Sequence, residues 1–269
     1  MKRKHAKEKS KLNVVLLVLR IICIVVIIVC LIYIFRWYLE NKKNADMLKN
    51  LKDSTILNTT TMQVEIPDDS STDENPDQKK TIEIPVYELD FPKLLATNNS
   101  TVGWIKVPNT SIDYPVAQAS NNDFYLNHSF DNSSNTAGWI FADYRNKFDG
   151  TDKNIIIYGH NRMDTSMFAT LKITQKDWWY NNNKYLTFTT PTSTIVYEVF
   201  SSYTTPAESY YLTTSFANDE SYLEFLNTLK SRSVHDFGVE LNPNDSIITL
   251  STCDASGNSR VIVHAKRIN

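Results

Sequence analysis

Cys253 is the residue whose type and position best suit it to act as a nucleophile. It closes the run TLSTC at residues 249–253, and the polar loop 254–259 follows directly. A strand end beside a loop presents a side chain to substrate, whereas a cysteine within a strand usually fills core space. A free thiol has a pKa near 8.5, so this chemistry needs a cation or a base nearby.

Arg260 is expected to lie opposite Cys253. The loop between them is rich in Gly, Asn, Asp and Ser, so the strand that begins at Arg260 should return antiparallel to the cysteine strand. A guanidinium cannot accept a proton at any relevant pH. We therefore expect Arg260 to hydrogen-bond the substrate carbonyl and the oxyanion that develops on it, with a plain surface strand residue as the alternative.

His160 is the predicted proton-transfer residue among five histidines. It follows the apolar run 155–158 and Gly159, at an abrupt junction of strand and loop. Histidine is the side chain that titrates near neutral pH. His264 shares a strand face with Arg260, and the residues alone favour His160 over His264 only slightly. His264 therefore stays open as the alternative base.

A long apolar segment precedes this region. Residues 14–35 are almost wholly Leu, Ile and Val, interrupted by Arg20, and about 20 such residues span a bilayer core as a helix. The basic residues before it place the N-terminus on the cytoplasmic side. We expect a cytoplasmic basic tail at 1–12, a transmembrane helix at 13–36 and an extracellular remainder. A cleaved signal peptide is the alternative, but no small-x-small cleavage site follows the segment.

Two of the three cysteines, Cys23 and Cys30, fall inside the predicted membrane helix, so Cys253 is the only exported thiol. A lone exported cysteine cannot form an intramolecular disulfide, which removes the usual structural reason for its presence. Beyond Arg20 acidic residues outnumber basic ones, and no basic cluster occurs there. This charge pattern excludes nucleic acid as a partner.

The exported part divides into a polar segment and a folded domain. Residues 37–81 are expected to be a stalk and polar linker, because the acidic, Ser- and Pro-rich stretch 68–76 cannot bury a core. The catalytic domain should cover 82–269. Within it we expect a short capped helix after Asp90 and a longer helix at 219–230, before the cysteine strand. Eight strands are predicted, at 102–107, 112–116, 139–141, 154–158, 185–189, 194–203, 247–252 and 260–267, and this number suggests a closed barrel.

Several motifs together resemble the sortase family. The run TLSTC resembles its TLxTC signature, YGHN at 158–161 matches its histidine motif, and Arg260 occupies the position of its arginine. Blocks at 103–105, 112–116, 125–126, 138–141 and 167–168 resemble class B sortase sequence in the same order. The resemblance covers about 91–268. It implies a mostly β fold, a closed eight-stranded sortase barrel with an N-terminal helix, and the helix before the cysteine strand favours class B.

The resemblance also implies a reaction and its partners. Sortases are cysteine transpeptidases that cleave a C-terminal sorting signal after Thr through a thioacyl intermediate, and then transfer the protein to a cell-wall peptide amine. By similarity, Cys253, His160 and Arg260 are the catalytic residues, and no metal or organic cofactor is expected. The expected partners are surface proteins with a sorting signal, a peptidoglycan precursor amine and the membrane. Ser251 and Thr252, which precede the nucleophile, are predicted substrate contacts.

The sequence alone is also compatible with two other functions. An exported cysteine endopeptidase would use the same Cys-His pair with water as the acceptor. A binding module could instead hold zinc through Cys253, His160 and His264, although three scattered ligands without paired spacing make a weak zinc pattern.

Overall fold

The computed structural model describes residues 2–67, 79–253 and 258–269. The chain divides into two compact units, Met1–Asp46 and Met47–Asn269. Helix α1, Lys2–Thr55, makes up the first unit and continues into the second. Among the described residues, one helix is long and apolar enough to cross a membrane, the stretch Val15–Thr55. The predicted transmembrane segment at 13–36 falls on this helix.

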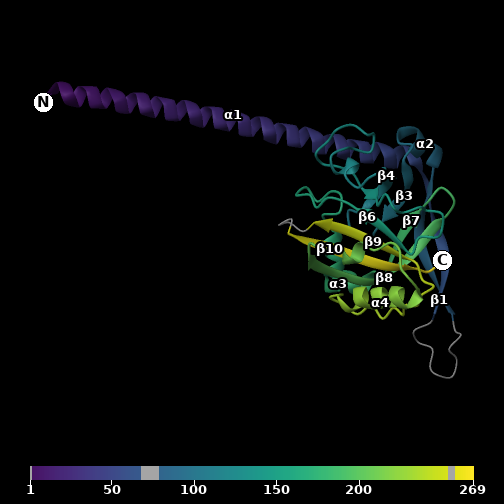
Figure 1. Ribbon diagram of the computed structural model, residues 1–269. Helices are drawn as coiled ribbons and strands as arrows, with labels where there is room; N and C mark the ends of the chain where they lie inside the picture. Colours follow the sequence, from purple (N-terminus) through teal and green to yellow (C-terminus); the bar gives the residue numbers. More distant parts are fainter. Residues whose placement is uncertain (1, 68–78, 254–257) are drawn as a thin grey trace. The chain divides into compact units, whose positions relative to one another are not determined.

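Eight described strands of the second unit form a closed barrel in the order β10-β8-β7-β3-β4-β5-β6-β9, and β9 pairs with β10 to close it (Figure 1). This arrangement confirms the predicted fold class. Pairs β4–β5 and β6–β9 are parallel and the other neighbours are antiparallel. The strands are β3 (Thr101–Lys106), β4 (Asp113–Gln118), β5 (Phe141–Ala142), β6 (Asn154–Tyr158), β7 (Tyr185–Thr189), β8 (Thr194–Pro206), β9 (Ile247–Cys253) and β10 (Ser259–Arg267).

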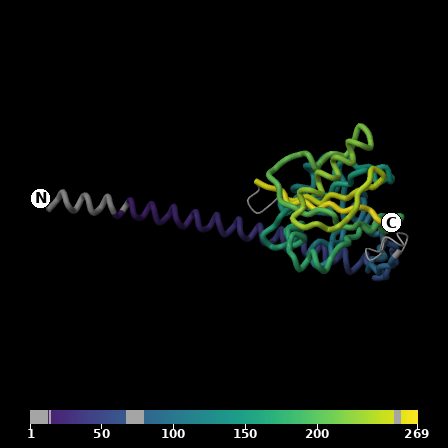
Figure 2. Tube along the Cα trace, turned by 90° about the horizontal axis from the view of Figure 1, so that it is seen from below, coloured from purple at the N-terminus to yellow at the C-terminus, as the bar shows by residue number. Residues whose placement is uncertain are grey.

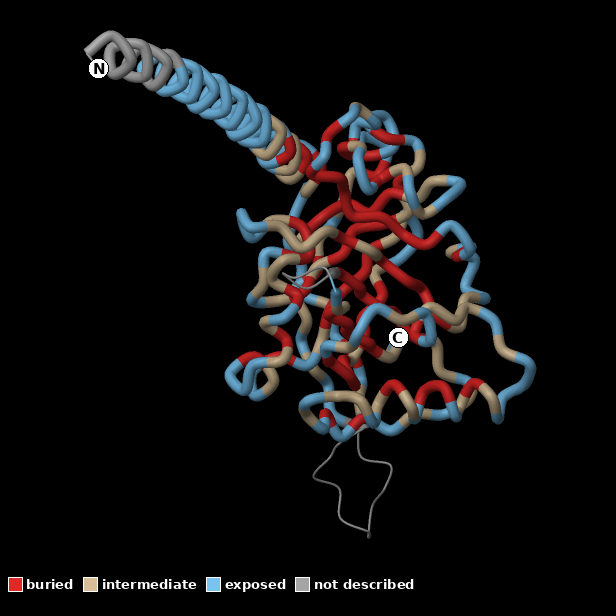
Figure 3. Tube along the Cα trace, turned by 60° about the vertical axis from the view of Figure 1, so that its left-hand side comes forward, coloured by how far each residue is buried: buried red, intermediate tan, exposed pale blue. Residues whose placement is uncertain are grey.

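The core fills the barrel. Strand β6 reads NIIIY and is buried on both faces, as expected for a strand with parallel and antiparallel neighbours inside a closed sheet. Buried residues follow the barrel strands, whereas the helix from residue 15 to 39 is exposed (Figure 3). Strands β9 and β10, at the yellow end of the colour scale, run side by side (Figure 2).

Helices surround the barrel and connect its strands. Helix α2, Phe91–Thr97, has Asp90 as its N-cap, with the carboxylate accepting a hydrogen bond from the backbone N–H of Lys93. Helix α4, Asp219–Ser231, is the predicted helix before the cysteine strand, and it begins with a capping box. The remaining helices of the described residues are α3 (Asp177–Asn182) and the short 3₁₀ turns η1 (Phe124–Leu126), η2 (Leu171–Gln175) and η3 (Tyr210–Leu212).

The expected linker is corrected by the structure. Residues 37–55 continue helix α1, which agrees with a helical stalk. The residues expected to be linker instead form a hairpin of β1, Ile56–Pro67, and β2, Lys79–Leu89. The Thr, Val and Ile residues of both segments favour extended backbone, and pairing satisfies their N–H and C=O groups. The expectation came from the stretch 68–76, which lies outside the described residues. The second compact unit accordingly begins at Met47, before the predicted domain boundary at 82.

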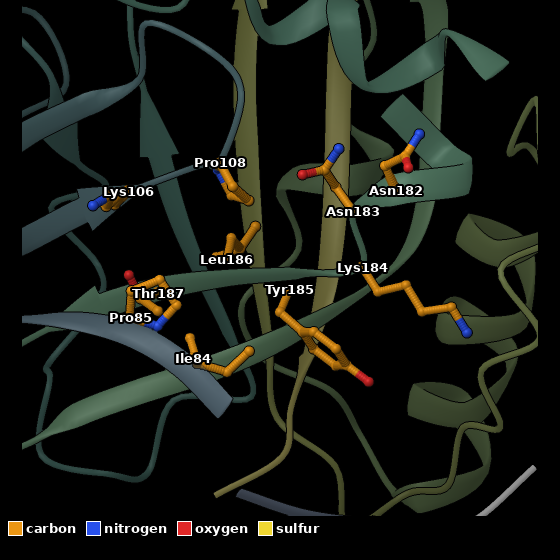
Figure 4. Close-up of a pocket in the computed structure, with 10 residues that line it drawn as sticks. All are labelled: Ile84, Pro85, Lys106, Pro108, Asn182, Asn183, Lys184, Tyr185, Leu186 and Thr187. Atoms are coloured by element: carbon orange, nitrogen blue, oxygen red, sulfur yellow. The ribbon is translucent and has the colours of Figure 1, made fainter. Parts of the chain in front are cut away.

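A pocket of about 180 Å³ lies where β2 approaches β7. Figure 4 shows Ile84 and Pro85 of β2 facing strand residues Tyr185 and Leu186, with Lys106 at the edge. Of the predicted catalytic side chains that the structure describes, neither His160 nor Arg260 lines this pocket, so it is separate from the groove that they line.

Candidate active site

The ends of β9 and β10 bring Cys253 and Arg260 opposite each other. The two residues are paired in the antiparallel register, as the sequence predicted. The backbone of Cys253 ends β9, but its side chain and residues 254–257 lie outside the described part of the chain. Arg260 is half-buried, and its guanidinium donates a hydrogen bond to the carbonyl of Ser259 at 3.0 Å.

The parallel pairing of β6 with β9 brings His160 to the same place. Tyr158 pairs with Ser251, and the backbone N–H of Gly159 donates to the Ser251 carbonyl at 3.3 Å. Since parallel strands advance together, the residue two positions beyond each partner lies at the same level. Those residues are His160 and Cys253. The barrel topology therefore gathers the three predicted catalytic positions at one edge.

The imidazole of His160 is held by backbone on one side. Its Nε2 lies 2.8 Å from the carbonyl oxygen of Leu126, at the end of η1. Because a carbonyl oxygen can only accept, Nε2 carries the hydrogen. In the neutral ring, Nδ1 is then the nitrogen with the available lone pair.

Gly138 makes room for this histidine, and Gly159 allows close packing just before it. Gly138 has a φ of +63°, and a Cβ at this position would lie 2.6 Å from imidazole Cδ2 of His160. A Cβ at Gly159 would lie 2.5 Å from Ile140 and 2.7 Å from Phe168. Gly159 thus serves close packing, whereas Gly138 combines close packing with a left-handed backbone.

A groove of about 650 Å³ passes over this edge of the barrel. His160 and Arg260 line it together with the predicted substrate contacts Ser251 and Thr252, and further wall residues come from segments 122–126, 158–159 and 207–212. The Ser251 hydroxyl is hydrogen-bonded to the phenol of Tyr211 at 3.1 Å. The buried Thr252 hydroxyl has no hydrogen-bond partner within the described part of the chain.

His264, the alternative base, lies inside the barrel. Its side chain is fully buried, Nδ1 lies 2.9 Å from the Thr249 hydroxyl, and Nε2 lies 3.1 Å from the Tyr203 hydroxyl. Burial lowers the pKa of His264 to about 3, and the positive charge of Arg232 acts in the same direction. His264 does not line the groove, so neither the general-base alternative nor a zinc site shared with His160 fits its position.

Three groups that contact or surround the site residues were not predicted from the sequence. The Leu126 carbonyl is a backbone atom and has no residue-type signal. Gly138 stands in the recognised block 138–141, but its positive φ is a property of the fold. Asp143 is a fully buried carboxylate just beyond β5, and its one sequence signal is the arginine two residues later.

Comparisons with known proteins agree with this geometry. Residues 105–268 match the model of the sortase domain. Sortase B of Listeria monocytogenes is 38% identical over 183 residues, covering 66% of this chain and 73% of the relative. Sortase B of Staphylococcus aureus is 37% identical over 181 residues, covering 66% and 74%.

Solved structures of sortase B share the fold. The Bacillus anthracis enzyme in complex with AAEK1 matches with a TM-score of 0.69 and 31% identity, covering 87% of this chain and 99% of that one. The Clostridium perfringens enzyme matches with a TM-score of 0.64 and 38% identity, covering 67% and 100%. A Staphylococcus aureus sortase B–substrate complex matches with a TM-score of 0.63, 37% identity and coverage of 66% and 84%. With a closed eight-stranded barrel, a matching family model and these class B relatives, the chain belongs to the sortase family of cysteine transpeptidases.

Proposed function

We propose that this enzyme cleaves a C-terminal sorting signal after its threonine and transfers the resulting protein to an amine of a cell-wall peptide. Cys253, His160 and Arg260 are its catalytic residues. One observation carries the proposal. The ends of β6, β9 and β10 are neighbours in the barrel, and His160 and Arg260 line one groove of about 650 Å³ together with Ser251 and Thr252, which precede Cys253.

The first half of the reaction forms a thioester. The Cys253 thiol gives its proton to Nδ1 of His160, the sulfur attacks the carbonyl carbon of the threonine, and Arg260 hydrogen-bonds the oxyanion of the tetrahedral intermediate. The peptide bond after the threonine then breaks. His160 donates the proton that the departing amine needs, from Nδ1, because Nε2 is occupied by the Leu126 carbonyl.

The second half reverses the roles. An amine of the wall peptide attacks the thioester carbonyl, gives its proton to Nδ1 of His160, and displaces the Cys253 thiolate. A new amide bond replaces the one that was broken, so the bonds balance without a cofactor. Ser251 and Thr252 both line the groove, which supports a further role for these two residues in contacting the bound peptide.

The relatives and the N-terminal helix support the setting. Staphylococcus aureus sortase B has been solved as a substrate complex, which supports peptide binding in the corresponding groove here. The apolar part of α1 supports a single membrane span. With the basic tail inside, the catalytic domain faces outward, where it meets surface proteins and the lipid-linked wall precursor.

The test is direct detection of the thioester. The full chain in detergent is incubated with peptides of the Asn-Pro-x-Thr and Pro-x-Thr-Gly types, and mass spectrometry is used to look for an acyl adduct on Cys253. We expect an adduct in the wild type and none in Cys253→Ala. A wild-type enzyme that cleaves such peptides without an adduct would overturn the proposal.

An added amine separates the proposed reaction from that of a cysteine endopeptidase. Triglycine or a wall-type peptide amine is added at millimolar concentration to the same reaction. A transpeptidase converts the adduct to a new amide product, whereas an endopeptidase with the same Cys-His pair releases only the hydrolysed acid.

A further inference from the structure

Asp143 collects hydrogen bonds from several segments of the chain. It lies just beyond β5, and its side chain is fully buried. Its carboxylate accepts from the Tyr158 hydroxyl at 2.8 Å and from the Asn122 side-chain amide at 3.0 Å. Arg145 donates to both carboxylate oxygens, from Nε at 2.8 Å and from Nη2 at 2.7 Å. Bidentate pairing of this kind fixes geometry as well as charge.

The partners of Asp143 belong to the groove wall. Asn122 and Tyr158 line the groove. The Nη2 of Arg145 also donates to the carbonyl of Leu212 at 3.0 Å, and Leu212 lines the groove too. One buried carboxylate thus connects three wall segments, which come from the approach to η1, the end of β6 and the end of η3.

The charge of Asp143 determines whether the Tyr158 hydroxyl donates or accepts hydrogen bonds with other groups. Burial alone would raise the pKa of the Asp143 carboxyl, but the hydrogen bonds from Arg145, Tyr158 and Asn122 outweigh burial and lower it. Burial and the nearby Asp143 charge raise the pKa of the Tyr158 phenol, which stays protonated. An ionised carboxylate only accepts, so the phenol hydrogen is committed to Asp143 and the phenol oxygen can only accept from other groups.

We propose that Asp143 is a positioning residue that holds these three wall segments in place and makes Tyr158 a hydrogen-bond acceptor toward the bound peptide. The groove therefore selects a peptide that places an N–H donor next to the phenol oxygen of Tyr158. The inference rests on the proposed function, because it concerns binding of the sorting-signal peptide. Asp143 acts on peptide recognition and leaves the Cys253 and His160 chemistry unchanged.

The experiment compares two matched aspartates in the full chain. Asp113 is a similar centre on β4, accepting from Trp104 Nε1 at 2.7 Å, from the Tyr87 hydroxyl at 3.1 Å and from Lys52 at 2.7 Å. Neither Asp113 nor these partners line the groove. Asp143→Asn and Asp113→Asn therefore remove the same charge from comparable networks, one at the groove and one away from it.

Steady-state cleavage of a peptide that the wild type accepts is the first readout. For Asp143→Asn we expect KM to rise by about 10-fold to 100-fold with kcat within about 3-fold, since interactions with bound peptide are lost. Asp113→Asn should keep the wild-type KM. Tyr158→Phe removes the phenol oxygen alone and should raise KM about 10-fold, which keeps the proposal testable if Asp143→Asn folds poorly.

Alkylation of Cys253 by iodoacetamide across pH is the second readout, because it reports the thiol and its base without any peptide. We expect the profile of Asp143→Asn to match that of the wild type. A shifted profile would show that Asp143 acts on the catalytic pair, and equal KM changes in both Asn variants would show a general structural effect. Either result, or wild-type KM values in both Asp143→Asn and Tyr158→Phe, overturns the inference. A wild type that cleaves no peptide removes the proposed function as well.

Discussion

Two histidines on the neighbours of the cysteine strand have opposite environments. Strands β6 and β10 both pair with β9, and each leads to or contains a histidine. His160 lies two residues beyond the end of β6, half-buried at the groove, with one nitrogen on a backbone carbonyl. His264 lies within β10, fully buried, with both nitrogens hydrogen-bonded. Because the two residues are of the same type, their position relative to the strand end decides which histidine can exchange protons with a substrate.

The buried histidine is locked in one tautomer. The Thr249 hydroxyl donates to the Asn154 side-chain carbonyl at 2.7 Å, so its oxygen must accept from Nδ1–H of His264. Nε2 then accepts from the Tyr203 hydroxyl. A second proton on this ring would leave the Tyr203 hydrogen facing an N–H donor inside the barrel. His264 therefore works as a neutral structural group.

Exchanging each histidine for glutamine should separate the two roles most strongly. His160→Gln should lower kcat by about 100-fold to 10,000-fold, because the leaving amine loses its proton donor. His264→Gln should keep kcat within about 3-fold at neutral pH, measured on enzyme shown to be folded by circular dichroism. Comparable losses of kcat in the two folded variants would contradict the assignment of His160.

Variants of Arg260 test whether the end of β10 at the groove contributes to turnover in a way that the rest of the strand does not. Arg260→Ala should lower turnover by about 100-fold to 1000-fold, because the oxyanion loses a fixed donor. Arg260→Lys keeps the charge without the planar pair of donors, so an intermediate loss is expected. Arg267→Ala, at the other end of β10, is the control and should retain wild-type turnover in the peptide cleavage assay. A fully active Arg260→Ala would remove this residue from the mechanism.

The sequence predicts local features of this site better than distant ones. The pairing of Cys253 with Arg260 was predictable, because only a short turn-rich loop separates two β-branched strands. The approach of His160 was not, because β6 and β9 are parallel strands about 90 residues apart in the chain and their strand periodicity does not specify partners. Here the family resemblance supplied what the residues left open.

The same limit explains what was missed in the fold. Seven barrel strands follow β-branched or aromatic runs and lie within three residues of their predicted bounds, and α4 follows its apolar helical spacing. The strand predicted at 139–141 shares only Phe141 with the observed β5. The β1–β2 hairpin was not, because a ribbon of two strands buries few side chains and its composition is close to that of a polar linker. The Leu126 carbonyl and the positive φ of Gly138 are backbone properties that depend on tertiary structure.

A methyl group at Gly138 should disturb His160 without touching His264. The added Cβ of Gly138→Ala would meet both the imidazole of His160 and, at 2.7 Å, the carbonyl oxygen of Tyr125, so we expect kcat to fall by about 10-fold to 100-fold. Gly238→Ala is the matched control, because Gly238 has a similar positive φ of +73° and nothing within 4 Å of the new Cβ. It should lose about 1 kcal/mol of unfolding free energy in urea titrations and keep wild-type kcat. Equal kcat values in the two variants would mean that the contact with His160 has no role.

The smallest effect is expected in the pH dependence of stability, to which the buried His264 should contribute. In the unfolded chain a histidine has a pKa near 6.5, whereas burial lowers the folded pKa of His264 to about 3. Between these values the unfolded state binds a proton that the folded state does not, so stability is lost as pH falls below 6.5. Tyr203 stays neutral beside the ring, and Arg232 is the charged group that faces it.

Urea unfolding measured at pH 7 and pH 5 tests this difference. The wild type should lose about 2 kcal/mol more between these pH values than His264→Gln, which has no such proton to take up. At pH 7 the variant is expected to be less stable by about 1–3 kcal/mol, because two buried hydrogen-bond partners lose their imidazole. Identical pH dependence in the wild type and His264→Gln would mean that the barrel interior tolerates the charged ring, and the contrast between the two histidines would then rest on geometry alone.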